Sequence, residues 1–435
     1  MAGVGCGFAA ARGTSSFSLG VVAMKLNVLS VEEEAVLPLS AQQCETMERE
    51  AAGAEWTVEI KTRAQIQGMP AWAHAFTGLR KDRRYYELVE DTIHQGFEYR
   101  YFVLSDEYGQ VRAFQPFFIA DQDLLAGMGG GVSKSVALIR RIWPRFMRMR
   151  TLMVGCAAGE GHLDAEDEGS RCEIARSLGS TIVSQARQLK VSMIVFKEFK
   201  AADRAALACL KKCGFTRAPS MPMTRRNLNF ASFEDYMRNG LSAKFRAQLR
   251  REFRRSAERA QLEMRIVTDI TPYIDEIYPL YLAVYERSAL HFEKLTPEYL
   301  CRIGQSMPDK ALFFLMIKEG KIVSFNLCLT RESELCSEYV GFDYSVAFDL
   351  HLYNVMTRNI MEWAIANGYQ WYCSTSLNYE PKYHFRHELD PLDLYVRHGS
   401  PAVNFVMKRA LRYLEPTRSD AMLRRFPNYH DLHKD

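Results

Sequence analysis

The sequence predicts a mixed α/β protein made of two tandem copies of one domain, and three observations support this. The chain has 435 residues, a length that suits about two or three domains. The two halves repeat one order of strand-like and helix-like segments. The composition, with 48% hydrophobic and 25% charged residues, is that of a folded chain with a sizeable core.

A predicted β-hairpin opens the repeated unit in each half. In residues 101–120 two strand-like runs flank a polar turn that contains Gly109. In residues 313–330 two similar runs flank a shorter turn that contains Gly320. Short glycine turns between strand-forming runs are typical of hairpins, so both segments are expected to form antiparallel strand pairs.

The same order of elements continues after each hairpin. A strand ending at glycine is followed by a helix, a second strand, a short helical stretch and a final strand. The predicted helices span residues 172–190 and 350–367. Apolar residues in the second helix form one stripe, typical of a helix that faces a core: Leu352, Val355, Met356, Ile360, Trp363 and Ala364.

Three regions follow from this repeat. Residues 1–45, rich in small residues near their start, are expected to form a disordered extension, with Met24 as an alternative natural start. Residues 46–232 are expected to form the first domain. Residues 233–435 are expected to form the second, which opens with a basic helix.

Charge, cysteines and hydropathy exclude several classes of protein. The 56 basic and 52 acidic residues give a net charge of +4, too even for a chain that binds polyanions over its whole surface. The ten cysteines are scattered and form no C-x-x-C pair, as expected of reduced thiols. No apolar run approaches the ~20 residues that a membrane span needs. We therefore expect a cytoplasmic protein.

Two segments carry a resemblance to a known family. Residues 241–258, LSAKFRAQLRREFRRSAE, resemble the basic helix that opens the second domain of FemAB-like and BioF2-like proteins. Residues 337–386 resemble the core strand, helix and strand of that branch, followed by a lysine before an aromatic residue. The branch belongs to the GNAT acyltransferase superfamily, and the likeness covers about residues 55–415 as a pattern.

The resemblance implies two tandem GNAT-like domains and an acyltransferase that transfers an N-acyl or aminoacyl group to an amine. It implies no tightly bound cofactor, and an aminoacyl-tRNA or acyl-CoA as the donor. The acceptor would be a small molecule or a peptidoglycan precursor, tRNA is a candidate partner, and peripheral membrane contact is compatible with it. It leaves the oligomeric state open.

The glycine-rich turn with which many GNAT enzymes bind the pyrophosphate of CoA is missing in both halves. The second half has Asp349 near the helix start and no glycine there. The first half has glycines at 155, 159 and 161, but four carboxylates follow between residues 164 and 168. Carboxylates repel a diphosphate, which argues against acetyl-CoA.

The basic helix at 241–260 is the strongest local charge feature. Apolar residues at Phe245, Leu249 and Phe253 predict one packed face. Beside it lies a basic stripe that would contact phosphates of a nucleotide-linked substrate or a tRNA: Lys244, Arg246, Arg250 and Arg254. The other interpretation is a solvated helix face with ordinary surface ion pairs.

The richest polar cluster follows the last core strand. Lys382 matches the lysine that the family directs into the acceptor cleft, where it would hold an anion or stabilise an oxyanion. Arg386 would join it in an anion clamp. Tyr379 and His384 are the other predicted substrate-binding residues of this cluster. Since H-x-x-H at 384–387 lacks further ligands at suitable spacing, no metal is expected.

A proton acceptor is expected near the attacking amine. Side chains alternate along a strand, so Tyr339 and Asp343 share one face and Glu338 points to the other. Asp343 is the first candidate for the base, His351 is the second, and Tyr339 is a predicted substrate contact. For both candidate bases, a helix cap or a satisfied polar group is the alternative.

Two other functions fit the same sequence. One is a conventional N-acetyltransferase that depends on acyl-CoA. The other is a non-catalytic GNAT-fold protein that uses the basic helix to bind RNA or an anionic lipid precursor.

Overall fold

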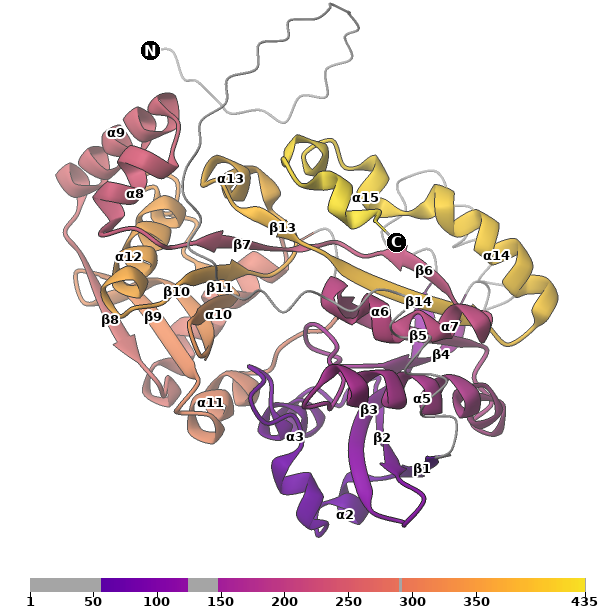
Figure 1. Ribbon diagram of the computed structural model, residues 1–435. Helices are drawn as coiled ribbons and strands as arrows, with labels where there is room; N and C mark the ends of the chain where they lie inside the picture. The colour runs from indigo at the N-terminus through magenta and orange to yellow at the C-terminus, as the bar shows by residue number, and fades with distance from the viewer. Residues whose placement is uncertain (1–55, 124–147, 289–291, 435) are drawn as a thin grey trace, which may run out of the picture. The chain divides into compact units, whose positions relative to one another are not determined.

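A computed structural model describes residues 56–123, 148–288 and 292–434 (Figure 1). The described residues belong to one compact unit. The extension predicted at 1–45 and the glycine-rich stretch at 127–131 lie outside the described residues.

Two seven-stranded mixed sheets form the framework. The first sheet has the order β1 (Thr57–Lys61), β2 (Glu98–Ser105), β3 (Val111–Asp123), β4 (Arg148–Val154), β5 (Met193–Lys200), β14 (Leu392–His398), β6 (Thr216–Pro219). The second has the order β8 (Leu262–Val267), β9 (Ala311–Lys318), β10 (Lys321–Arg331), β11 (Glu334–Phe342), β12 (Trp371–Ser374), β7 (Met223–Asn227), β13 (Glu388–Asp390).

The helices between and around the strands are α-helices and short 3-10 turns (η). They are α2 (Arg63–Ile66), η1 (Pro70–His74), α3 (Arg83–Thr92), α5 (Glu168–Gln188), η2 (Ala201–Asp203), α6 (Arg204–Leu207), α7 (Cys209–Lys212), α8 (Phe233–Gly240), α9 (Ala243–Arg259), η3 (Thr271–Tyr273), α10 (Ile274–Tyr285), α11 (Pro297–Ser306), α12 (Leu352–Ala366), α13 (Tyr379–His384), α14 (Pro401–Leu414), α15 (Pro416–Ser419), η4 (Leu423–Arg425) and η5 (Tyr429–Leu432).

The two predicted hairpins are confirmed as the antiparallel pairs β2–β3 and β9–β10. The predicted helices are confirmed as α5 and α12, which connect the parallel pairs β4–β5 and β11–β12. On α12 the predicted stripe is buried at every position except Trp363, which is partly buried against the same core. The tandem repeat of one mixed α/β unit is therefore present in the structure.

The last strand of each half lies in the sheet of the other half. Strand β7 pairs with β12 and β13 of the second sheet, and β14 pairs with β5 and β6 of the first. Figure 1 shows β14, from the C-terminal end, beside strands of the first half. The boundary predicted at 232/233 follows β7 in the chain, but the two sheets do not divide there.

The exchanged strand β14 is held by a buried ion cluster. Asp393 is fully buried and accepts from Arg204 Nε at 2.5 Å and from Arg217 Nη1 at 3.0 Å. Arg204 also donates to the backbone carbonyls of Asp431 and Leu432. The first half therefore binds both the exchanged strand and the C-terminal segment.

One apolar core is shared by the two halves. It contains Tyr85 and Phe114 from the first half together with Tyr299 and Phe325 from the second, all at most 1% exposed. Separate cores lie under α5, α6 and α7 of the first half and under α8, α9 and α12 of the second. A shared core ties the two repeats into one body.

Gly304 allows α11 to approach the backbone at residue 268, since a Cβ at this position would lie 1.9 Å from the Thr268 carbonyl oxygen. In an open helix, alanine in place of glycine stabilises by about 1 kcal/mol. Here we expect Gly304→Ala to lower the free energy of unfolding by about 2 kcal/mol, because backbone must move. Urea unfolding of the wild type and the variant measures the difference in free energy of unfolding. Gly179→Ala, which meets only side-chain atoms at 3.1 Å and beyond, should cost clearly less. Equal effects would contradict the prediction.

Candidate active site

The candidate site lies where the parallel strand pairs of both halves separate. Strands β11 and β12 are paired as far as Ser337 and Ser374, and β4 and β5 as far as Val154 and Phe196. Beyond these points the strands of each pair diverge. The residues that follow come from both halves and interact with one another, so the two separation points meet.

Four buried charges join these points. Arg80 and Lys81 precede α3, Glu160 follows β4, and Glu338 lies on β11. Arg80 binds Glu160 and, through Nε, Glu338 at 3.0 Å. Lys81 Nζ lies 2.5 Å from Glu160 and 3.2 Å from Glu338. We call these four residues the charge quartet.

The charge quartet is neutral overall and almost fully buried, with each residue at most 6% exposed. Burial opposes the charge of Glu160, but Arg80 and Lys81 outweigh it and hold the pKa of this carboxyl well below its ordinary value. Burial likewise opposes the charge of Lys81, whose pKa its two carboxylates raise. Both groups therefore stay ionised near pH 7.

A second pair of charged groups lies at the rim of the quartet. Lys197 lies within β5, directly after the last residue that pairs with β4, and it donates to Glu198 at 2.6 Å and to the Gly159 carbonyl at 2.8 Å. Glu293 accepts from the Tyr339 hydroxyl at 3.0 Å. Burial raises the pKa of Glu293, and the charge of Lys197 only partly opposes this. A carboxyl of this kind takes up a proton more readily than an exposed one.

Buried tyrosines from both halves contact one another next to Glu293. The Tyr299 hydroxyl donates to the Tyr85 hydroxyl at 3.0 Å, and Tyr85 donates to the Ala158 carbonyl at 3.0 Å. The Tyr339 ring packs edge-on against Tyr299. Burial raises the pKa of Tyr339 well above its ordinary value, so the predicted substrate contact is a neutral hydrogen-bond donor.

Lys382, the predicted catalytic lysine, is buried beside the end of β12. Its ammonium donates to the Thr375 carbonyl and, at 2.8 Å, to the Leu377 carbonyl. Thr375 Oγ1 in turn donates to the Glu338 carbonyl at 3.3 Å, across the separation point. Burial lowers the pKa of Lys382 to about 7. Lys382 therefore holds the diverging strand end and is about half protonated near pH 7.

The two predicted bases lie elsewhere. Asp343 follows β11, five residues and about 16 Å of extended strand beyond Glu338. Its carboxylate accepts from the backbone and side chain of Ser345, which lower its pKa, and it lies 3.5 Å from Lys321 Nζ. His351 is the left-handed N-cap residue of α12. The contacts of Asp343 favour a turn cap, whereas the His351 side chain makes no capping hydrogen bond to α12.

The predicted substrate-binding residues near Lys382 differ in how deeply they are buried. Tyr379 is buried and donates to the Pro222 carbonyl at 2.8 Å. His384 stacks on Phe245 of α9, with burial and then Arg425 lowering its pKa. Arg386 is exposed and has a positive φ of 57°. Since Lys382 is buried and Arg386 is in solvent, the two do not form the expected clamp.

The basic helix is confirmed as α9, with Phe245 and Leu249 buried. Two members of its predicted anion stripe have protein partners. Arg246 donates to the carbonyls of Met237 and Arg238, and Arg250 pairs with Glu234. The other two members, Lys244 and Arg254, are exposed. Half of the predicted stripe therefore makes contacts within the protein, and the other half faces solvent.

Carboxylates between residues 164 and 168 of the first half make structural contacts. Asp164 accepts from the backbone N–H groups of Phe76 at 2.6 Å and Phe114 at 2.9 Å, and burial raises its pKa to about 6. Asp167 caps α5 by accepting from the Ser170 N–H. A carboxylate therefore occupies the helix N-terminus at which a diphosphate would bind.

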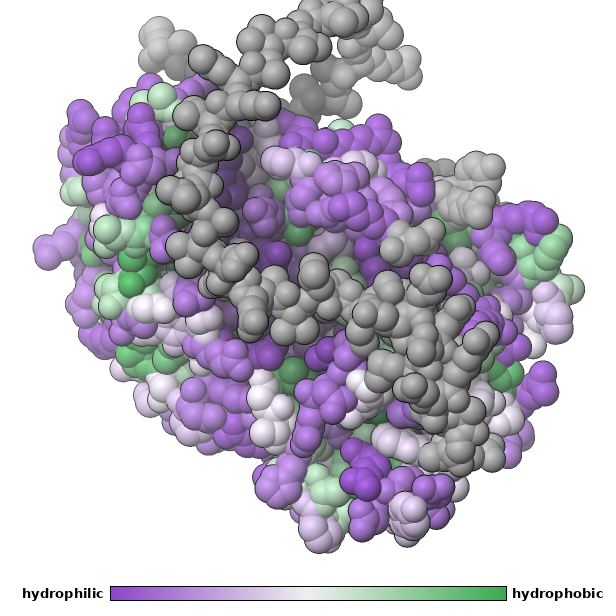
Figure 2. Space-filling model, viewed as in Figure 1, coloured by the Kyte–Doolittle hydropathy of each residue, from purple (hydrophilic) through white to green (hydrophobic). Residues whose placement is uncertain are grey.

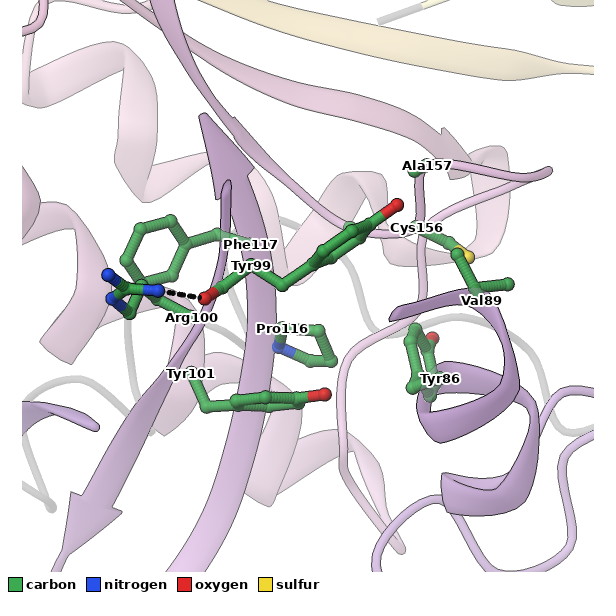
Figure 3. Close-up of a pocket in the computed structure, with 10 residues that line it drawn as sticks. Tyr86, Val89, Tyr99, Arg100, Tyr101, Pro116, Phe117, Cys156 and Ala157 are labelled. Atoms are coloured by element: carbon green, nitrogen blue, oxygen red, sulfur yellow. Dashed lines mark hydrogen bonds between the residues drawn. The ribbon is translucent and has the colours of Figure 1, made fainter. Parts of the chain in front are cut away.

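A small pocket lies beside the end of β4 (Figure 3). Tyrosines 86, 99 and 101 line it together with Pro116 and Cys156, and it has room for about one water molecule. The Tyr86 hydroxyl is buried and has no hydrogen-bond partner among the described residues. The pocket borders the site but is too small for a substrate as it stands.

Sequence reasoning missed most of the buried site. Arg80, Lys81, Lys197 and Glu293 belong to no recognised motif, and Glu338 was assigned to the face away from the cleft. The signal present was a charged residue inside an otherwise apolar strand, as at Lys197 in β5. Nothing in the sequence indicates which distant charges meet.

The described residues offer neither a metal centre nor a membrane-spanning helix. No group of three or more His, Cys, Asp or Glu side chains there could hold a metal ion. No helix in the same ranges has the length and apolar character needed to cross a membrane.

Two mixed sheets with separating parallel pairs define a tandem GNAT-like protein. The model of the FemAB-like family, described as peptidoglycan biosynthesis and recognition, matches residues 156–374, just over half of the chain. The chain belongs to this family. Membership supports an acyl or aminoacyl transferase in general. No curated protein sequence matches the chain.

Several solved structures are similar to this chain. The C-terminal domain of a putative lysylphosphatidylglycerol synthetase from Agrobacterium fabrum is 16% identical, with 77% of this chain and 94% of that chain covered and a TM-score of 0.44. FemX is 10% identical, with 78% and 96% covered and a TM-score of 0.46. A tandem GNAT protein from the clavulanic acid biosynthesis pathway is 9% identical, with 80% and 99% covered and a TM-score of 0.41.

Proposed function

We propose that this protein transfers an aminoacyl group from an aminoacyl-tRNA to the amine of a peptidoglycan precursor. One observation carries the proposal: the separation points of both halves meet at a site where the Glu293 carboxyl accepts from Tyr339 and the Lys197 ammonium lies 5.1 Å from the ring centre of the adjacent Phe292. Such a pair suits acyl transfer to an amine, which needs a proton acceptor and a positive group for the developing oxyanion.

The reaction is a direct displacement. The acceptor amine attacks the ester carbonyl, an amide C–N bond forms, and the ester C–O bond to the tRNA 3′-terminal ribose breaks. In this proposal Glu293 takes the proton from the amine and passes it to the leaving ribose oxygen, and Lys197 stabilises the oxyanion. Lys382 is a positioning residue, because its ammonium holds the Thr375 and Leu377 carbonyls at the strand end.

The choice of donor rests on the two helix N-termini after the fourth strand of each half. Asp167 caps α5, and Asp349, paired with Arg259 at 3.3 Å, lies shortly before α12. Carboxylates at both places oppose a CoA pyrophosphate. The exposed part of the α9 stripe, with Lys244 and Arg254, supports contact with tRNA phosphates.

The test is a transfer assay with a mixture of radiolabelled aminoacyl-tRNAs and a lysine-containing muramyl pentapeptide, with acetyl-CoA as the competing donor. We expect transfer from aminoacyl-tRNA, and Glu293→Gln should lower kcat about 100-fold because the proton acceptor is lost. The variant keeps the shape of the side chain, so its thermal unfolding should match the wild type.

Asp343→Asn is the matched control, since it removes the carboxylate that the sequence indicated as the base, and it should retain most activity. Turnover with acetyl-CoA and none with aminoacyl-tRNA would favour the conventional acetyltransferase. Full activity of Glu293→Gln would exclude Glu293 as the base. Binding of RNA without any turnover would favour the non-catalytic alternative.

A further inference from the structure

Helix α14 exposes an apolar face to solvent. Val403 is 41% exposed, Phe405 is 59% exposed and Val406 is 64% exposed. Figure 2 shows hydrophobic and hydrophilic atoms side by side over the position of α14 at the right edge of the molecule. Large apolar side chains gathered at one place on a surface mark an interaction site.

The fold fixes this face outward. Asn404 donates to the Gly214 carbonyl and accepts from the His398 N–H, both at 2.9 Å. Met407 and Leu411 pack against the shared core. Positions 404, 407 and 411 lie on one side of a helix, so the residues on the other side have to face away from the protein.

The surroundings of α14 are positively charged. Residues 180–192, 209–216 and 394–414 contain no Asp or Glu. Arg187 lies close enough to Arg397 to act on its charge, and Arg397 would contact a Cβ at position 214. Together with Lys408 and Arg409, both exposed on α14, these groups form a cationic border that has no carboxylate partner within the described ranges.

One contact joins an apolar residue of this face to a basic residue of its border. The Arg409 guanidinium lies 3.6 Å from the centre of the Phe405 ring. An aromatic ring capped by a cation can enter the boundary between headgroups and acyl chains while the cation stays with the phosphates.

We propose that the outer face of α14 docks on an anionic lipid bilayer. Val403, Phe405 and Val406 would enter the interface, and Arg187, Arg397, Lys408 and Arg409 would face the headgroups. An apolar strip with a basic border is the pattern of interfacial helices. The aliphatic side chains favour a bilayer over RNA, because phosphates and bases offer no matching apolar surface to valines.

The test is co-sedimentation of the full chain with vesicles, without donor or acceptor, so it is independent of the proposed reaction. We expect binding to phosphatidylcholine vesicles with 30% phosphatidylglycerol, a composition chosen to resemble roughly the anionic content of a membrane surface. The double variant Phe405→Ser/Val406→Ser should bind at least fivefold more weakly. Lys408→Gln should weaken binding about fivefold, the effect of one cation near an anionic surface.

Tyr108→Ser is the matched control, because Tyr108 is a large exposed side chain, 81% exposed, in the β2–β3 turn. It should bind vesicles like the wild type, and thermal unfolding of all the variants should be unchanged. Vesicle binding that the double variant retains would overturn the proposal. The proposal would also be overturned if the double variant lost binding to total tRNA but still bound vesicles. It would be overturned as well if the wild type were a dimer that the double variant dissociates.

Discussion

Glu160→Gln is expected to lower the free energy of unfolding at pH 7 by about 3–5 kcal/mol. The substitution keeps the size of the side chain but leaves Arg80 and Lys81 with one carboxylate in place of two. A buried charge without compensation carries a cost of this size, whereas the intact quartet is neutral. Urea unfolding of the wild type and the variant measures the difference.

The pH dependence of this difference has a definite sign. The folded-state pKa of Glu160 lies well below its ordinary value, so its stabilising effect is complete above the unfolded pKa of about 4.3. It is lost as the pH falls from there through the folded pKa. The gap between wild type and variant should therefore be constant from pH 6 to 8 and shrink below pH 4.

The matched control is Glu98→Gln, which removes a carboxylate from the Arg150 pair on the surface, where the two side chains are 41% and 52% exposed. Exposed pairs contribute about 0–1 kcal/mol. A loss of similar size in the two variants would mean that the charge quartet is hydrated in solution.

The quartet also shows where sequence-based prediction stops. The hairpins and helices were predictable because their signals, a glycine turn or an apolar stripe, lie within about ten to twenty residues of sequence. Arg80 and Glu338 are 258 positions apart, and no periodicity relates them. The exchange of β7 and β14 is of the same kind, since a final strand was predicted for each half but the sheet that it joins was not.

The candidate site was predictable in part. Lys382 was identified through the family resemblance, and the structure places it at a strand separation point. Alternation placed Asp343 on a face with Tyr339, but it could not show that the strand carries Asp343 into a turn. Glu293 and Lys197 become visible only when the two halves are packed together, because neither lies in a motif.

The charge state of Lys382 gives the second large effect. Its folded pKa is about 7, below the unfolded value of about 10.4. Between these values the unfolded chain binds the extra proton, so stability rises with pH. Relative to Lys382→Met, which cannot titrate, the wild type should gain up to about 1.4 kcal/mol per pH unit between pH 7.5 and 9.5.

Lys81→Met provides the contrast, because both lysines are buried but, within the described part of the chain, only Lys81 has carboxylate partners. Those partners raise the pKa of Lys81, so its stabilising effect is present below the unfolded value and is lost only above it. The free energy of unfolding of Lys81→Met should therefore lie below that of the wild type by a constant amount between pH 7.5 and 9.5. Over the same range the free energy of unfolding of the wild type should rise relative to that of Lys382→Met. Urea unfolding at three pH values in this range distinguishes the two slopes. A flat difference for Lys382→Met would show that Lys382 is charged in the folded protein and has an anionic partner.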